Sequence, residues 1–275
     1  MTVFRGISDL QRRGTPKMKT TLPVLIALMT IPAWPASHAQ SSRPTLAENG
    51  GNPFAGAVEA IKRSVAPLVC LAVKGGETTV VSRPGSVFFV SAGGDFLTAA
   101  HVLREQMNDH QCPVSAITLP LEGWQPKALD EPTTWFAFKI TSCAIDEILD
   151  VAVCRPTTDL RQISKVKIAP VQFDWDIPAD GTPVAFTGFP RALRDPMTFQ
   201  AGVAADRPVW RDGKAIDEVV LDRSALPGFS GSPVFLPNGR VVGMLVSGAA
   251  DESNTLTFLR PAAAWRAMLA EGVKK

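Results

Sequence analysis

The chain has 275 residues, a formal net charge of +2, and 45% hydrophobic and 20% charged residues. This length allows either two lobes or one large β-domain around a sizeable core. There is no internal repeat or low-complexity tract, and no cluster of Lys and Arg with interleaved aromatic residues follows residue 39. The composition therefore argues against a nucleic-acid-binding protein.

The first 39 residues predict an export signal preceded by a short polar extension. Two lysines lie just before an apolar stretch over residues 22–34, and Ser37-His38-Ala39 supplies the small residues that a signal peptidase reads, so we expect cleavage after Ala39. A membrane anchor is the alternative, but the apolar stretch is shorter than the ~20 residues that span a bilayer. The residues before Met18 are consistent with an over-long start of the reading frame. We expect an exported protein, periplasmic or secreted, without a membrane anchor after cleavage.

Removal of this signal takes away five basic residues and one acidic residue, which changes the net charge to −2. All four cysteines, Cys70, Cys112, Cys143 and Cys154, lie after the signal. An even number of cysteines in an exported chain favours one or two disulfides. Three full pairings are open, and buried free thiols are the alternative because Cys70 and Cys154 lie in apolar runs.

The elements after the signal predict an all-β protein. Residues 40–53 predict a flexible leader, and residues 55–65 a short helix. Short β-branched and aromatic runs then predict strands of a first lobe over 54–160, at 68–73, 78–82, 86–91, 96–98, 117–119, 135–141 and 150–153. Strands of a second lobe over 161–275 are predicted at 166–171, 184–187, 197–203, 219–221, 233–236, 240–246 and 255–259. Pro261 is predicted to open a C-terminal helix that runs through Leu269. Many short strands with dense turn signals are typical of sandwiches or barrels.

The segment at residues 227–233, Pro-Gly-Phe-Ser-Gly-Ser-Pro, predicts a catalytic nucleophile at Ser230. A serine between two glycines can present its hydroxyl and adjacent amide hydrogens to one carbonyl oxygen, as acyl transfer requires. A simple Gly/Ser turn is the alternative interpretation. Ser232 is the competing nucleophile, but the proline after it makes a poorer site for two convergent amides.

A serine nucleophile needs a general base, and the histidines restrict the choice. The chain has three histidines, and His38 leaves with the signal. His101 follows an apolar strand that runs into small residues, whereas His110 lies in a polar stretch at 105–111 that predicts a solvated loop. We therefore expect His101 to be the base.

The base needs a carboxylate to hold its tautomer, and Asp150 is the best candidate. It leads directly into the apolar strand at 151–153, where an unpaired acid would be costly. Asp146 and Glu147 are the alternatives, in a setting that predicts a turn. The order His101, Asp150, Ser230 excludes an α/β-hydrolase, whose histidine follows its serine. A subtilisin-like arrangement with Asp95 as the acid disagrees with the short strands.

These motifs resemble those of trypsin-like, chymotrypsin-fold serine peptidases, nearest the bacterial HtrA/Deg and glutamyl-endopeptidase-like branches. The resemblance spans Phe54 to Leu269 and is carried by three segments in the family's order: 97–101, Leu-Thr-Ala-Ala-His; 150–153, Asp-Val-Ala-Val; and 228–233, Gly-Phe-Ser-Gly-Ser-Pro. It implies two six-stranded antiparallel β-barrels with the site between them. No space is expected for the PDZ domain of HtrA proteins.

The resemblance also implies the roles of other residues. The amides of Gly228 and Ser230 would form the oxyanion hole. Ser224 and Ala225 match the wall of the primary pocket, where small uncharged residues imply no strong demand for a basic side chain. Substrate would pair along the strand that ends near Ser247-Gly248.

Phe229 departs from the family pattern, because activated trypsins carry there an Asp that pairs with a newly cut N-terminus. We therefore expect no such zymogen switch, and the geometry of the oxyanion loop becomes a question for the structure. The predicted function is that of an exported serine endopeptidase that acts on polypeptides through an acyl-enzyme, with no cofactor. The alternatives are a protease-like binding module of weak or no activity, and a metal site built from His101, His110 and Cys112.

Overall fold

The computed structural model describes residues 2–4, 51–75, 77–108, 112–120, 135–163, 165–191, 195–248 and 256–271. Apart from Gly51, these residues belong to one compact unit. The predicted signal and most of the predicted leader lie outside the described residues. Within the described ranges, no helix is long and apolar enough to cross a membrane.

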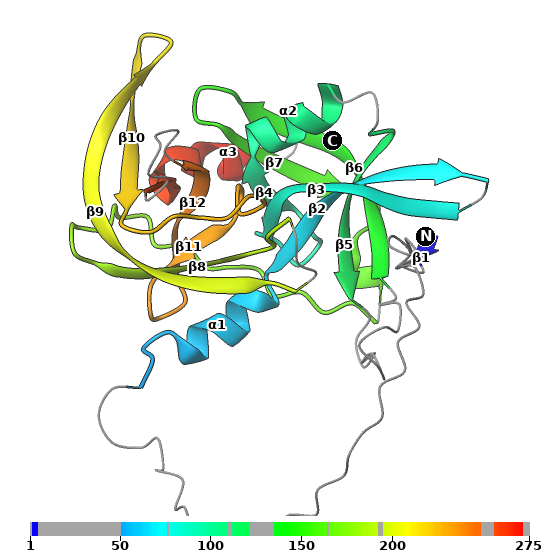
Figure 1. Cartoon of the computed structure of the whole chain (residues 1–275), viewed down its shortest axis with the longest axis horizontal. Coiled ribbons are helices and arrows are strands. Elements are labelled where there is room, and N and C mark those ends of the chain that lie inside the picture. Colours follow the sequence, from blue (N-terminus) through cyan, green and yellow to red (C-terminus); the bar gives the residue numbers. More distant parts are fainter. Residues whose placement is uncertain are drawn as a thin grey trace, which may run out of the picture. The chain divides into compact units, whose positions relative to one another are not determined.

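The first half of the chain forms a closed antiparallel sheet (Figure 1). Its strands are β1 (Thr2–Phe4), β2 (Val65–Lys74), β3 (Glu77–Phe89), β4 (Phe96–Ala99), β5 (Val114–Pro120), β6 (Trp135–Asp146) and β7 (Val151–Pro156). They follow the order β1-β6-β5-β2-β3-β4-β7, and β6 also pairs with β7. That second pairing of β6 closes β2 to β7 into a six-stranded barrel, and β1 adds to its edge along β6.

The second half forms another closed barrel, in the order β10-β13-β12-β11-β8-β9. Its strands are β8 (Pro183–Gly188), β9 (Met197–Arg211), β10 (Lys214–Leu221), β11 (Pro233–Phe235), β12 (Val241–Gly248) and β13 (Thr257–Pro261). The strands β9 and β10 make a long hairpin that projects from this barrel (Figure 1). The two barrels confirm the predicted all-β, chymotrypsin-like fold.

The helices are short. They are α1 (Ala55–Lys62), α2 (Ala100–Asn108), α3 (Arg266–Glu271) and the 3₁₀ turns η1 (Leu160–Gln162) and η2 (Ala262–Trp265). The predicted C-terminal helix is therefore a 3₁₀ turn followed by α3. The prediction of a loop at 105–111 was wrong for residues 105–108, because α2 extends to Asn108. Residues 103–107 are Leu, Arg, Glu, Gln and Met, all strong helix formers, and their propensity outweighs the polar pattern.

One predicted strand does not form, and two others are joined into one. Residues 166–171 form no strand but lie in the crossing between the barrels, where the Ala169 N–H donates to the Arg63 carbonyl at 3.1 Å and the Val171 N–H to the Phe89 carbonyl at 2.9 Å. The strands predicted at 78–82 and 86–91 are one strand, β3. A register shift opposite β2 accommodates Pro84, which a regular ladder would exclude.

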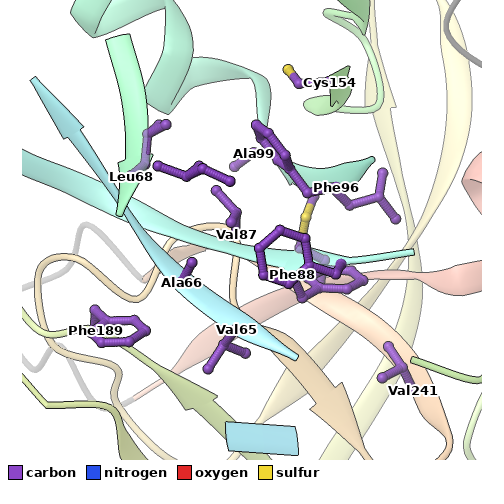
Figure 2. Close-up of a cluster of buried hydrophobic side chains, with 14 of the residues drawn as sticks. Val65, Ala66, Leu68, Val87, Phe88, Phe96, Ala99, Cys154, Phe189 and Val241 are labelled. Carbon is purple, nitrogen blue, oxygen red and sulfur yellow. The ribbon is translucent and has the colours of Figure 1, made fainter. Parts of the chain in front are cut away.

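One apolar core runs through the first barrel and into the contact with the second. Figure 2 shows Val65, Leu68 and Phe88 of the first barrel in the same cluster as Phe189 and Val241 of the second. A separate apolar cluster fills the second barrel. Because the contact between the barrels is apolar and continuous with a core, its close packing fixes residues on both sides of the boundary.

Both disulfides lie in the first barrel. Cys70 of β2 joins Cys112, just before β5, and Cys143 of β6 joins Cys154, its directly paired partner on β7. No free cysteine remains among the described residues. The structure therefore selects one of the three pairings that the sequence left open.

We expect the two disulfides to contribute unequally to stability. The first closes a loop with a sequence separation of 42 residues and the second one of 11 residues. Loop-closure entropy then predicts that a Cys70→Ala/Cys112→Ala variant loses about 4 kcal/mol of unfolding free energy and a Cys143→Ala/Cys154→Ala variant about 3 kcal/mol. Urea unfolding of each variant beside wild type, without a reductant, measures both values. A larger loss from the second pair would contradict this ranking.

Candidate active site

His101 and Asp150 meet where two segments of the first barrel turn. The strand β4 ends at Ala99, and α2 begins at once, so that His101 lies in its first turn. Asp150 ends the turn between β6 and β7. One oxygen of its carboxylate lies 2.8 Å from the His101 Nδ1, and the other accepts the His101 backbone N–H at 2.8 Å. The Ala100 N–H donates to the Asp150 carbonyl at 3.2 Å. Both the ring and the backbone of His101 are thus tied to Asp150.

Asp150 has an unusual backbone conformation, with φ at +57°. Non-glycine residues rarely adopt this left-handed region, so the surroundings must hold it. The Asp146 carboxylate accepts the N–H groups of Ile148 and Leu149 at 3.0 and 2.9 Å, and Arg260 Nε donates to the Leu149 carbonyl at 2.9 Å. Asp150 is therefore both buried, at 7% exposure, and fixed from several sides.

The other acids that the sequence offered are engaged elsewhere. Asp146 caps the turn before Asp150, and Glu147 pairs with Arg104 on α2. Asp95, the acid of the subtilisin-like alternative, pairs with Arg155 at 2.7 Å. Among the described residues, Asp150 is the acid that contacts the His101 ring.

Ser230 lies on the loop before β11, and this loop docks on the first barrel. The Ser230 carbonyl oxygen accepts the Ser86 backbone N–H of β3 at 2.8 Å. The next residue, Gly231, has φ at +87°, and a Cβ there would overlap the Ser86 carbonyl and come within 3.2 Å of the Ala99 nitrogen. Only glycine fits this close approach. The contact brings the Ser230 loop against the end of β4, two residues before His101.

The two amides expected to bind an oxyanion are oriented by their neighbours. The Pro227 carbonyl accepts the Arg191 N–H at 2.8 Å, and the Phe229 carbonyl accepts the Ser232 N–H at 2.9 Å. In a trans peptide the C=O and N–H point in opposite directions, so the N–H groups of Gly228 and Ser230 point away from those partners. Neither N–H donates to an acceptor within the described residues.

Phe229 anchors the loop by apolar packing. Its side chain is fully buried in the second barrel, with ring centroids 5.4 Å from both Phe186 and Phe199. The ring pair with Phe186 is edge to face at 89°, a favourable geometry for aromatic rings. The aromatic cluster thus holds the loop at the position where the resemblance to trypsins implies an ion pair.

Two residues that support these groups were not predicted from the sequence. The Ser86 hydroxyl is fully buried, donates to the Gly228 carbonyl at 2.8 Å and accepts the Phe189 N–H at 2.8 Å. Arg260 is fully buried as well. A lone basic residue directly after the predicted strand at 255–259 was a signal for Arg260. Ser86 carried no signal, because its partners lie more than 100 residues away.

Four other residues predicted for the site follow β10 or end β12. Ser224 is exposed and Ala225 half-buried in the segment after β10. Ser247 and Gly248 end β12 opposite Phe258 and Thr257. His110 lies outside the described residues. For the metal-site alternative, Cys112 is in a disulfide and so is no thiolate ligand, and the described residues hold no group of three or more potential metal ligands.

A known protein family matches much of this chain. The model of the trypsin-like peptidase domain family matches residues 85–244, more than half of the chain. The chain therefore belongs to the trypsin-like peptidase family. A search of curated protein sequences finds no significant match.

Solved structures support the fold. The Rv3671c protease from M. tuberculosis in its active form is 20% identical, with a TM-score of 0.57 over 80% of this chain and 85% of that one. The MamO protease domain from Magnetospirillum magneticum is 16% identical, with a TM-score of 0.55 over 79% of this chain and 100% of that one. At these identities the likeness concerns the chymotrypsin-like fold alone.

Ser86 and Ser232, both fully buried, offer a matched test of the Ser86 contacts. Ser86→Ala leaves the Gly228 carbonyl and the Phe189 N–H buried without a partner, so we expect it to lower the unfolding free energy by about 1–3 kcal/mol. Ser232 is equally buried, but its hydroxyl has no hydrogen-bond partner in the described structure. Ser232→Ala should therefore be close to neutral. Urea unfolding of both variants compares them, and equal losses would contradict the assignment.

Proposed function

We propose that the protein is an exported serine endopeptidase with Ser230 as nucleophile, His101 as general base and Asp150 as the acid that orients His101. The observation that carries the proposal is the His101–Asp150 pair, bound through both carboxylate oxygens beside the docked Ser230 loop. An Asp bound to Nδ1 keeps the proton on that nitrogen and leaves Nε2 free to accept one.

The chemistry follows from these roles. The Ser230 hydroxyl oxygen bonds to the carbonyl carbon of the substrate while its proton moves to His101 Nε2. The C–N bond then breaks, and the amine leaves with that proton. Water, deprotonated by the same nitrogen, attacks the resulting ester and releases the acid together with the restored serine. The two half-reactions need no cofactor.

The amides of Gly228 and Ser230 would stabilise the negative oxygen that forms in each half-reaction. Their orientation by the Pro227 and Phe229 carbonyls supports this role, since such donors stabilise a transition state most when they need no reorganisation. Removing one donor of this kind costs on the order of 100-fold to 1,000-fold in turnover in other proteases. Ser224 and Ala225 would form the primary pocket, and substrate would pair with β12 at Ser247 and Gly248.

The Phe229 cluster bears on activation and on the alternative function. A loop anchored by apolar packing needs no charged N-terminus, so we propose that the protein is active without a zymogen cut. Phe229 was the feature that favoured a binding module of weak or no activity. Its packing supports turnover over that alternative, because the aromatic rings hold the loop that carries the amides of Gly228 and Ser230.

Export is part of the proposal. The two disulfides fit an oxidising compartment, and the predicted signal, which ends at Ala39, supplies the route. Cleavage after Ala39 would remove β1 from the edge of β6. The six-stranded ring of β2 to β7 does not need that strand to close.

A fluorophosphonate probe tests the proposal. The mature chain should be labelled at Ser230, as mass spectrometry of the labelled peptide would show, and should cleave casein or a peptide library. Ser230→Ala should abolish both labelling and cleavage while it keeps the fold, and Ser232→Ala should retain both. A folded wild type that neither reacts with the probe nor cleaves peptides would refute the proposed function.

A further inference from the structure

A fully buried arginine links the second barrel to the turn that carries Asp150. Arg260, in β13, is 0% exposed. Its Nε donates to the Leu149 carbonyl of the first barrel at 2.9 Å, and its Nη1 donates to the Asp217 carbonyl of β10 at 2.6 Å. Its Nη2 lies 3.7 Å from the Glu218 carboxylate. One guanidinium thus joins both barrels.

Burying this charge is unfavourable unless it is compensated. Burial lowers the pKa of Arg260, and the attraction of Glu218 raises it in part. Glu218 is itself buried, at 4% exposure, and also pairs with Arg207 at 3.1 Å and Arg211 at 3.7 Å. The carboxylate would therefore keep two cationic partners without Arg260. Neutralising Glu218 does not explain why a third arginine is buried here.

The contact with Leu149 offers an explanation. The Leu149 carbonyl belongs to the peptide group whose N–H is that of Asp150, so its direction sets the rotation of Asp150 about φ. That rotation is at the left-handed value of +57°. A donor that fixes this carbonyl holds the strained conformation, and the conformation directs the carboxylate to the ring and backbone of His101.

We propose that Arg260 is a positioning residue for Asp150: its guanidinium fixes the Leu149–Asp150 peptide from the second barrel, so that the acid meets His101. The His101–Asp150 hydrogen bond of the first barrel then depends on a side chain of the second. The consequence for turnover rests on the proposed protease function. The consequence for the hydrogen bond does not.

Arg207 provides a matched control. It binds the same Glu218 carboxylate at 3.1 Å, but its side chain is 51% exposed and it contacts the ring of Phe258 rather than the Asp150 turn. Arg207→Met and Arg260→Met therefore both remove a cation from Glu218. Arg260→Lys is the second variant, because it keeps the buried charge but loses the planar fork that reaches two carbonyls at once.

The test measures the hydrogen bond and turnover in the same proteins. The proton on His101 Nδ1 gives a far-downfield NMR signal when it is bonded to a carboxylate, and ¹⁵N-histidine labelling with a His101→Ala reference assigns it. Peptide hydrolysis gives kcat and KM, and thermal unfolding gives the folded fraction.

We expect Arg260→Met and Arg260→Lys to weaken or lose the His101 signal and to lower kcat on the order of 100-fold with little change in KM, as misplacement of a catalytic group does. Arg207→Met should keep both the signal and kcat. A folded Arg260→Lys protein with the wild-type signal and kcat would overturn the proposal, as would equal effects of Arg207→Met. If wild type hydrolyses no peptide, the proposed function fails, while the NMR comparison still decides the role of Arg260.

Discussion

The structure depends on the docking of the Ser230 loop against β3, because the candidate triad is divided between two barrels. The hydrogen bond from the Ser86 N–H to the Ser230 carbonyl and the close approach at Gly231 set that docking. Around it, the apolar core continues from the first barrel into the second (Figure 2). A close-packed boundary of this kind resists small displacements, so groups on either side keep a common geometry.

Each group of the site is held by contacts that come from elsewhere in the chain. The Ser86 hydroxyl of the first barrel holds the Gly228 carbonyl, and Arg260 of the second holds the peptide before Asp150. Phe229 fixes the same loop from inside the second barrel with Phe186. Side chains of each barrel therefore hold backbone groups of the other barrel's part of the site. Preorganisation of this kind is what oxyanion stabilisation and proton transfer require.

The sequence was sufficient to predict the fold class and the His101–Asp150 contact. Apolar periodicity is a local property, and the order of the motifs can be read directly along the chain. The sequence did not predict features that depend on contacts between residues far apart in the chain. The crossing at 166–171 is apolar enough for a strand, but its hydrogen bonds go to the ends of other elements. The disulfide pairing and the role of Ser86 required the spatial arrangement of segments that are far apart in the chain. The strained φ of Asp150 has no signal in the sequence.

We propose that Ser230 acts beside a preformed oxyanion hole. A crystal structure of the mature protein after reaction with a fluorophosphonate measures this most directly. We predict a covalent bond to the Ser230 oxygen, with one phosphonyl oxygen about 2.7–3.1 Å from the amide nitrogens of Gly228 and Ser230. A Pro227 carbonyl turned into that space, with the phosphonyl oxygen directed to solvent, would contradict this role of the loop.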